Sequence, residues 1–244
     1  MVIEFMSIAI IIPTYNEKEN IINLVIELSK ITEKSQIVIV DDSKKDDISK
    51  KIENLNNVKL IFRGKKLGRG SAILEGLKYL KENSEAEIFI EMDADYSHDP
   101  SELQKNLFLH SEKNYDLLIS SRYLKDSKII NWPLSRRIFS YFANKLARFL
   151  LGVPISDYTN GYRIYSKSAV DHISKNCGKI GDGFIILSEI LVELYYNGFK
   201  VGETKSKFVN RVRGESSVNL KEILNSLFGL LKIFKLKNKI RQKS

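Results

Sequence analysis

The sequence predicts an α/β fold with a Rossmann-like, mostly parallel central sheet flanked by helices. The first observation is a series of short apolar runs, rich in β-branched residues, of the kind found in strands buried on both faces. The second is that stretches with helical periodicity separate these runs, which is typical of strands joined by helical crossovers. The third is size and composition, because 244 residues, 43% hydrophobic and 28% charged, suffice for one sizeable folded domain.

The residue pattern places the strands and helices of the first half. Neither a repeat nor a low-complexity linker interrupts the series, so we expect no domain boundary within it. We expect strands at residues 7–13, 36–40, 58–62, 88–92 and 116–120, and helices at 19–30, about 71–81 and 100–110.

Polar clusters stand where three of these strands end. Residues 15–17 follow the first strand, and residues 41–42 follow the second. Residues 93–95 follow the fourth. In doubly wound sheets, ligands bind beyond the carboxyl ends of the strands. We therefore expect the three clusters to share one ligand site.

Asp93 and Asp95 are candidates for a metal site. Side chains two residues apart in an extended backbone point to the same side, so the two carboxylates can converge where the strand ends. Hard oxygen donors of this kind suit Mg²⁺ or Mn²⁺, which share their coordination shell with substrate phosphates. The pattern favours a metal-bound nucleotide diphosphate, although by itself it also fits a solvated acidic turn.

Other nucleotide-binding classes lack their motifs here. Gly68 and Gly70 belong to no Walker loop, and no G-x-G-x-x-G follows the first strand. These absences disfavour P-loop kinases and NAD enzymes. Cys177 is the single cysteine, which excludes an intrachain disulfide.

Several polar residues have two possible roles or none. The histidines His98, His110 and His172 share no metal-ligand spacing, and we expect them at the surface. Asp157 fits either a turn or a substrate contact. Glu189, in a predicted helix, fits a structural or a donor-contacting role.

The second half predicts two amphipathic helices. In residues 134–152 an apolar stripe runs beside basic side chains, which fits either core packing or contact with a membrane surface. An extended aromatic segment (156–165) and a helix (183–197) follow. Residues 208–217 predict a mobile basic loop, and residues 220–236 predict the second amphipathic helix.

The net charge of +9 is concentrated near the end of the sequence. Residues 221–244 carry seven basic side chains and one acid, which is +6 of that total. An anionic membrane surface and nucleic acid are both partners for such a tail. The tail has no aromatics interleaved at stacking distance, so we expect a membrane surface and no nucleic acid. The N-terminal residues form neither a secretory signal nor a spanning helix.

Segments along nearly the whole chain match one family pattern. They are IIPTYNEKENI, VIVDDS, KKLGRGSAILEGL, MDADYSHDP, SSRY, W-x-x-x-R-x-x-x-S at Trp132, SDYTNGYRIYSK, FVNRVRGESS and KEILNSLFGLLKIF. In order and spacing they resemble the inverting GT-A glycosyltransferases of family 2 and, within them, the dolichyl-phosphate (polyprenyl-phosphate) mannose synthases. The resemblance implies a GT-A domain at 1–218 with an acceptor loop at 208–217. It further implies a C-terminal amphipathic interface helix with a basic tail at 219–244.

The resemblance implies a role for each matching position. The nucleotide sugar would be bound by Pro13, Tyr15, Glu17, Asp42, Asp93, Ala94, Asp95, Arg122 and Arg211. A divalent cation, Mg²⁺ or Mn²⁺, would be bound by Asp93, Asp95 and Ser97. The acceptor phosphate would be bound by Arg122, Arg136, Ser140 and Arg211. The resemblance also implies catalytic roles for Asp95, Arg122 and Arg136.

The implied reaction is the inverting, metal-dependent transfer of mannose from GDP-mannose to dolichyl or polyprenyl phosphate. A phosphate acceptor is already ionised at neutral pH, so we expect no general base. A UDP-glucose-dependent glucosyltransferase is the alternative, and a non-catalytic, nucleotide-binding protein of the membrane surface is a third hypothesis. We expect peripheral attachment to the cytoplasmic face of a membrane, without a transmembrane segment, directly or through a membrane-subunit partner.

Three positions depart from the family pattern. Aspartate is usual where Asn210 stands, lysine where Ser217 stands, and a small residue where Asn160 stands. We expect Arg213 to replace the phosphate contact that a lysine at position 217 would supply. The departures leave the family assignment intact and bear on the identity of the sugar and the acceptor.

Overall fold

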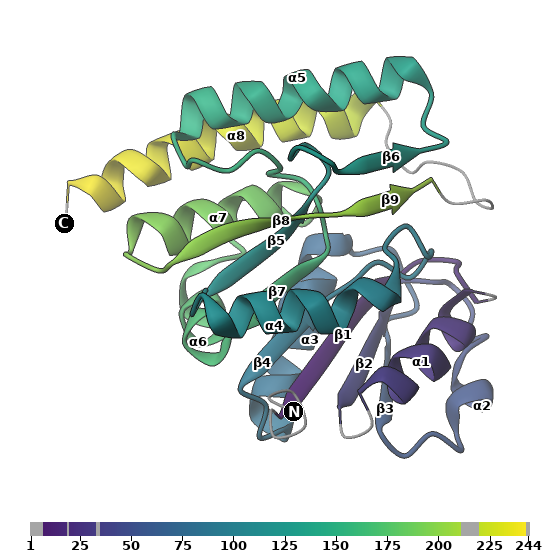
Figure 1. Cartoon of the computed structure of the whole chain (residues 1–244). Helices are drawn as coiled ribbons and strands as arrows, with labels where there is room; N and C mark the ends of the chain where they lie inside the picture. Colours follow the sequence, from purple (N-terminus) through teal and green to yellow (C-terminus); the bar gives the residue numbers. More distant parts are fainter. Residues whose placement is uncertain (1–6, 19, 33–34, 211–219, 243–244) are drawn as a thin grey trace.

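The computed structural model describes residues 7–18, 20–32, 35–210 and 220–242. A seven-stranded sheet crosses it in the order β3-β2-β1-β4-β7-β5-β8 (Figure 1). Every pairing in this sheet is parallel except the two made by β7, so the sheet is mostly parallel, as predicted. The strands are β1 (Ile8–Thr14), β2 (Gln36–Asp41), β3 (Val58–Phe62), β4 (Ile88–Glu91), β5 (Leu117–Ser121), β7 (Arg163–Ser166) and β8 (Val201–Lys205).

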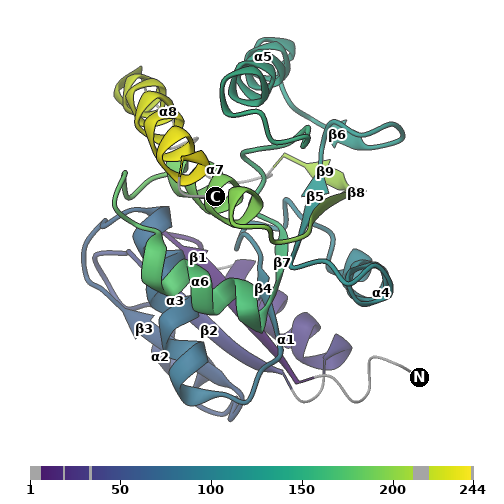
Figure 2. The ribbon, with the colours of Figure 1, turned by 90° about the vertical axis from the view of Figure 1, so that its left-hand side faces the viewer.

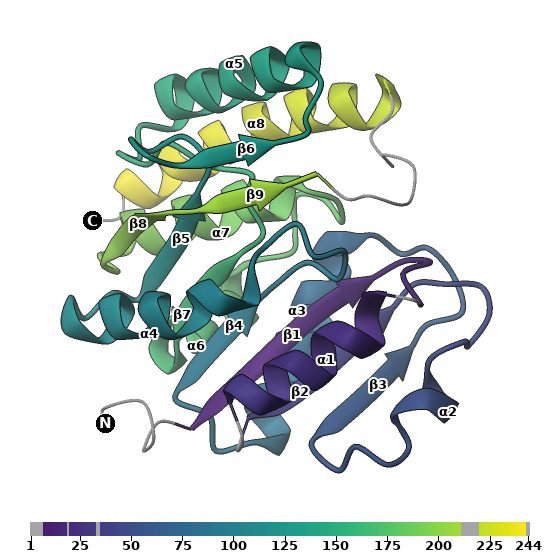
Figure 3. The ribbon, with the colours of Figure 1, turned by 45° about the vertical axis from the view of Figure 1, so that its right-hand side comes forward.

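Helices cover both faces of the sheet, and the alternation of side chains along β1 decides which helix packs on which face. Ile10 and Ile12 pack with α1 and α4, whereas Ala9 and Ile11 pack with α3, α6 and α7. Figures 2 and 3 show the two helical layers from different sides. The helices are α1 (Asn20–Ile31), α2 (Ser49–Ile52), α3 (Arg69–Asn83), α4 (Leu103–Glu112), α5 (Leu134–Leu151), α6 (Lys167–Asn176), α7 (Ile185–Tyr196) and α8 (Leu220–Arg241), with a 3-10 turn η2 (Pro100–Glu102).

The predicted strands and helices of the first half are confirmed, with ends shifted by one or two residues. The helices α2 and α6, the strand β8 and a two-stranded sheet of β6 (Lys128–Ile130) and β9 (Lys207–Val209) were not predicted. The prediction of a mobile loop at 208–217 is wrong at its start, because Phe208 is buried in β9. Residues 211–217 lie outside the described residues.

The two predicted amphipathic helices, α5 and α8, lie side by side above the sheet (Figure 1). α8 packs on both α5 and α7. Gly229 permits the approach of α8 to α7, because a Cβ there would lie 2.5 Å from the side chain of Ile185. Within the described ranges, no helix combines the length and the apolarity that crossing a bilayer requires.

Candidate active site

Asp95 and Ser97 are held together in the turn that follows β4. Asp95 Oδ1 accepts hydrogen bonds from the backbone N–H of Ser97, at 3.0 Å, and from the Ser97 hydroxyl. Between them Tyr96 has a φ of 57°, which non-glycine residues keep only where the surroundings enforce it. The Tyr96 hydroxyl donates to Glu27 at 3.2 Å, a contact that secures the turn to α1.

Two side chains, Arg69 and His98, bind the Asp93 carboxylate. Arg69 donates to Asp93 Oδ1 from Nη2 at 2.6 Å and from Nε at 3.2 Å. On the other oxygen, His98 Nε2 lies 3.1 Å from Oδ2. Burial alone would raise the pKa of Asp93, but the charge of Arg69 and the hydrogen bonds hold the pKa well below its usual range. The carboxylate is therefore ionised and fixed in orientation.

Arg69 connects the site to the core of the sheet. Its Nη1 lies 2.7 Å from Glu91 Oε1, and Glu91, wholly buried, accepts a hydrogen bond from Tyr165 at 2.7 Å. A Cβ at Gly161 would collide with Arg69 Nη2, so only glycine leaves room for the guanidinium. We did not predict a role for Arg69 from the sequence, although it lies in the matching segment KKLGRGSAILEGL.

The donor set fits a divalent cation. Asp93 and Asp95 supply ionised or hydrogen-bonded carboxylate oxygens, and Ser97 supplies a hydroxyl oxygen. Over the described residues, no cluster of three or more His, Cys, Asp or Glu side chains could enclose a metal by itself. Oxygen donors of these kinds are those that Mg²⁺ takes together with water and substrate phosphates.

Residues at the ends of β1 and β2 form the predicted nucleotide side. Tyr15 is exposed, and Lys66 Nζ lies 5.0 Å from the centre of its ring. Glu17 accepts a hydrogen bond from Asn20 at 2.9 Å at the start of α1. Pro13 lies inside β1, where it pairs in register with β2. The region thus has one exposed aromatic face and one carboxylate beside it.

Asp42 uses both oxygens within the protein. It is paired with Arg63, and it accepts hydrogen bonds from the backbone N–H groups of Leu67, at 2.9 Å, and Gly68, at 2.8 Å. Its carboxylate therefore shapes the loop that leads into α3. Gly68, at the N-cap of α3, has a φ of 102°, a conformation that favours glycine.

Arg122 forms a buried, bidentate ion pair with Asp157. Nε donates to Oδ2 of Asp157 at 2.8 Å, and Nη2 donates to Oδ1 at 2.8 Å. Nη2 also donates to the Thr159 hydroxyl at 2.7 Å. Burial alone would raise the pKa of Asp157, but the Arg122 charge lowers it below its usual value. Of the two roles that the sequence leaves open for Asp157, the contacts support the turn, because Asp157 Oδ1 also accepts a hydrogen bond from the backbone N–H of Thr159 at 3.2 Å. In addition, Asp157 holds Arg122.

Arg136 and Ser140 lie on neighbouring turns of α5. The Arg136 guanidinium stacks 4.3 Å above the ring centre of Trp132, and its Nη1 donates to Asn210 at 3.2 Å. Ser140 accepts a hydrogen bond from Tyr123 at 2.6 Å. The Arg136 contact places its guanidinium beside Asn210, directly after β9.

Phe208 is the junction between the carboxylate side and the arginine side. Its ring centre lies 5.3 Å from that of His98 and 5.3 Å from that of Trp132. The guanidinium carbon of Arg122 lies 5.4 Å from it. A pocket of about 310 Å³ opens beside this junction, lined by Glu27, Asp95, Tyr96, His98, Asp99, Pro100, Val209 and Asn210. Arg211, which follows Asn210, lies outside the described residues.

The histidine predictions need correction. His98 is wholly buried in the site, and His110 is buried in α4, so the prediction of surface positions is wrong for both. Burial lowers the pKa of His110 to about 4. His172 is partly exposed and lies 3.4 Å from Glu193. The signal for His98 was its place inside the matching segment MDADYSHDP, directly after the metal-binding pattern.

Glu189 lies away from these residues. One oxygen accepts hydrogen bonds from the backbone N–H groups of Gly178, at 3.0 Å, and Lys179, at 3.2 Å. Of the two roles left open by the sequence, the contacts support the structural one. Cys177 lies close by, and burial raises the pKa of its thiol well above the usual value, which disfavours the nucleophilic thiolate.

Comparisons with known proteins identify the family of this chain. The model of the family "Glycosyl transferase family 2" matches residues 9–174. Polyprenol monophosphomannose synthase of Mycolicibacterium smegmatis is 33% identical over 90% of this chain and 83% of that protein. Dolichol-phosphate mannosyltransferase of Pyrococcus furiosus is 34% identical over 96% of this chain and 66% of that protein.

A solved structure supports the fold. Glucosyl-3-phosphoglycerate synthase from Mycobacterium tuberculosis, in complex with Mn²⁺, UDP-glucose and phosphoglyceric acid, superposes with a TM-score of 0.66. The match covers 95% of this chain and 80% of that one, at 16% identity. The fold is therefore that of GT-A-like enzymes. On the family match and the two relatives, the chain belongs to glycosyl transferase family 2 and is a glycosyltransferase.

Proposed function

We propose that the enzyme transfers mannose from GDP-mannose to a polyprenyl (dolichyl) phosphate, with inversion at the anomeric carbon and with Mg²⁺ or Mn²⁺ bound. The names of both curated relatives support this acceptor and this sugar. The proposal rests on one observation, which is that the Phe208 ring packs against both His98 and Arg122. The Phe208 ring thus lies between the carboxylates that suit a metal diphosphate and the arginines that suit a phosphate.

On the donor side, each residue has a role that its contacts support. Tyr15 and Glu17, with Pro13 beneath them, bind the base and ribose. Asp42 contributes by shaping the loop at 63–68 beside them. Asp93, Asp95 and Ser97, with the backbone at Ala94, bind the cation and the diphosphate. The cation would offset the charge that develops on the departing nucleoside diphosphate.

On the acceptor side, arginines bind the lipid phosphate. Arg122 already binds Asp157 and Thr159 through Nε and Nη2, and its Nη1 makes no hydrogen bond to any described residue. That nitrogen can donate to a phosphate oxygen, while Asp157 keeps the guanidinium in place. Arg136, Ser140 and Arg211 complete the phosphate site. Arginine cannot lose its charge at physiological pH, so the site stays cationic.

No general base is required for this reaction. A phosphate monoester is substantially ionised at neutral pH, since its second pKa is about 6. One phosphate oxygen forms a bond to the anomeric carbon as the bond from that carbon to the diphosphate oxygen breaks, and GDP leaves. Attack from the opposite face inverts the configuration. The protein therefore contributes positioning and electrostatic stabilisation.

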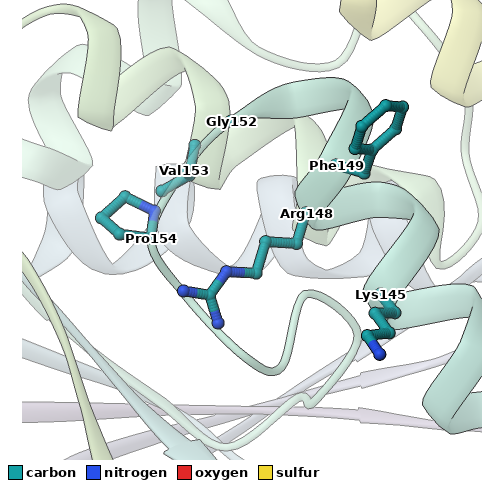
Figure 4. A pocket seen from close by; sticks show the side chains of 6 residues that line it. All are labelled: Lys145, Arg148, Phe149, Gly152, Val153 and Pro154. Atoms are coloured by element: carbon teal, nitrogen blue, oxygen red, sulfur yellow. The ribbon is translucent and has the colours of Figure 1, made fainter.

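The exposed faces of α5 and α8 suit a membrane surface. Large apolar side chains project from them, among them Phe149, which is 83% exposed, and Phe142, which is 61% exposed. Lys145 and Arg148 lie on the same helix and, with Phe149, line a cavity of about 430 Å³ at its C-terminal end (Figure 4). Apolar and basic residues together favour contact with anionic lipids, where the polyprenyl acceptor resides.

The test is a transfer assay with two donors. Purified protein is incubated with polyprenyl phosphate and either GDP-mannose or UDP-glucose, with Mn²⁺, with Mg²⁺ or with EDTA. We expect a mannosylated lipid in the organic phase from GDP-mannose, and none with EDTA. Product from UDP-glucose alone would replace the proposed donor, and no product from either donor would refute the proposed acceptor.

A further inference from the structure

His98 lies at the centre of the site and is wholly buried. Its Nε2 lies 3.1 Å from Oδ2 of Asp93, an ionised carboxylate that can only accept. Nε2 therefore carries a proton and donates it to this oxygen. Nδ1 has no hydrogen-bond partner among the described residues. One edge of the ring thus donates to Asp93, and no polar group in the described part of the chain binds the other edge.

Packing holds the rest of the ring. The centre of the His98 ring lies 5.3 Å from that of Tyr162 and 5.3 Å from that of Phe208. The backbone is also paired, because His98 forms an antiparallel bridge with Phe208, and Val209 N–H donates to Ser97 at 3.0 Å. His98 and Phe208 therefore have little freedom to move independently.

Phe208 carries these contacts to the arginine side. Its ring packs edge-on against Trp132, and Arg122 lies 5.4 Å from its centre. Arg122 lies 5.2 Å from the Trp132 ring centre, and Arg136 stacks on that same ring. The sequence of contacts from Asp93 through His98 and Phe208 to Arg122 is continuous. Close-packed interiors of this kind transmit small displacements.

We propose that His98 is a positioning residue that couples the two halves of the proposed site. Its Nε2–H orients Asp93 for the metal diphosphate, and its ring sets the position of Phe208 and hence of Arg122 for the acceptor phosphate. The proposal rests on the proposed function for the naming of the two halves. It gives one side chain two separable roles, one at the ring edge and one at the ring face.

Two substitutions separate the roles. His98→Phe keeps a ring between Tyr162 and Phe208 and removes the N–H. His98→Gln keeps an N–H donor near the position of Nε2 and removes the ring. Phe208→Leu removes the ring contact without touching Asp93, and it stands in should His98→Gln fail to fold. His172→Gln, at a partly exposed histidine outside the site, is the matched control.

The first measurement is calorimetric binding of GDP with Mn²⁺, or of UDP with Mn²⁺ if the wild type uses that donor. The second is KM for polyprenyl phosphate. For His98→Phe we expect nucleotide binding about tenfold weaker, as for other residues that orient a metal ligand, and an unchanged acceptor KM. For His98→Gln and Phe208→Leu we expect unchanged nucleotide binding and an acceptor KM raised about fivefold.

The outcomes are distinct. The two roles are supported if His98→Phe weakens only nucleotide binding and His98→Gln raises only the acceptor KM, while His172→Gln behaves like the wild type. Equal losses of both parameters in both variants, or no loss in either, overturn them and leave His98 a residue of the core. If the wild type glycosylates no lipid, the proposed function fails, whereas the binding measurement still decides whether His98 orients Asp93.

Discussion

Arg69 places two nitrogens on a single carboxylate oxygen of Asp93, Nη2 at 2.6 Å and Nε at 3.2 Å. Its third nitrogen, Nη1, lies 2.7 Å from Glu91, which has no exposed surface. Glu91 and Asp93 raise the pKa of the guanidinium against the opposing effect of burial, so Arg69 stays charged. One side chain thus ties a residue of the proposed metal site to the core of the sheet.

Gly161→Ala should impair the donor side through Arg69. The new Cβ would collide with Nη2 and would lie 3.0 Å from Asp93 Oδ1, so the guanidinium must leave its position. We expect kcat/KM for the donor to fall at least roughly tenfold, as when a residue that orients a metal ligand is lost. Gly183→Ala is the control, because a Cβ there meets nothing within 4 Å. Equal kinetics for the two variants would contradict this role of Arg69.

Asp95→Ala should abolish transfer in a folded protein. The variant removes the carboxylate that the turn at residues 95–97 holds in place. We expect product below about a thousandth of wild type, measured as glycolipid formed at saturating Mn²⁺. Asp99→Asn changes a second carboxylate that lines the same pocket and should retain most activity. Substantial transfer by Asp95→Ala would place the metal elsewhere.

Asp157→Ala should destabilise the fold. It leaves the Arg122 guanidinium buried without its bidentate partner, and breaking a buried ion pair in this way costs about 3–5 kcal/mol. Urea unfolding followed by circular dichroism measures the loss. The double variant Arg122→Met/Asp157→Leu should regain much of the stability but no activity. A double variant as unstable as Asp157→Ala would argue against the ion pair as the cause.

His110 should make stability depend on pH in a defined window. Burial lowers its folded-state pKa from near 6.5 to about 4, so the unfolded chain binds the proton more readily between these values. The contribution of His110 to the free energy of unfolding is fully present above about pH 6.5. It falls by about 3 kcal/mol as the pH falls toward 4. The difference in unfolding free energy between the wild type and His110→Gln should therefore shrink by that amount from pH 7 to pH 4.

Lys145→Gln/Arg148→Gln should weaken binding to anionic liposomes. Each basic residue near such a surface contributes about 1 kcal/mol, so we expect roughly thirtyfold weaker binding in a sedimentation assay and no change on neutral liposomes. Lys237→Gln is the informative control. Its Nζ is buried and donates to Leu150 at 3.0 Å, so it should lower stability and leave lipid binding unchanged. Loss of binding in Lys237→Gln alone would reverse the assignment.

Lys237 shows that a count of charges in the sequence does not tell which basic side chains face a membrane. The sequence counts Lys237 with the basic residues of the C-terminus that face a membrane. In the structure its ammonium satisfies a carbonyl at the C-terminal end of α5, and burial lowers the pKa of Lys237. A helical pattern shows which residues share a face, but whether that face meets lipid or another helix depends on a segment 87 residues away.

The sequence by itself determined the order of the strands and of the longer helices in the first half, and the position of Asp93 and Asp95 at a strand end, because periodicity and spacing act over a few residues. The family was indicated by the resemblance of its motifs to a known pattern. Only the tertiary structure decided that Arg69, His98 and Asp157 hold Asp93 and Arg122, and that Phe208 separates the two sides. The physical reason is that these pairs meet through packing of distant segments, and burial and hydrogen-bond geometry exist only once those segments have come together.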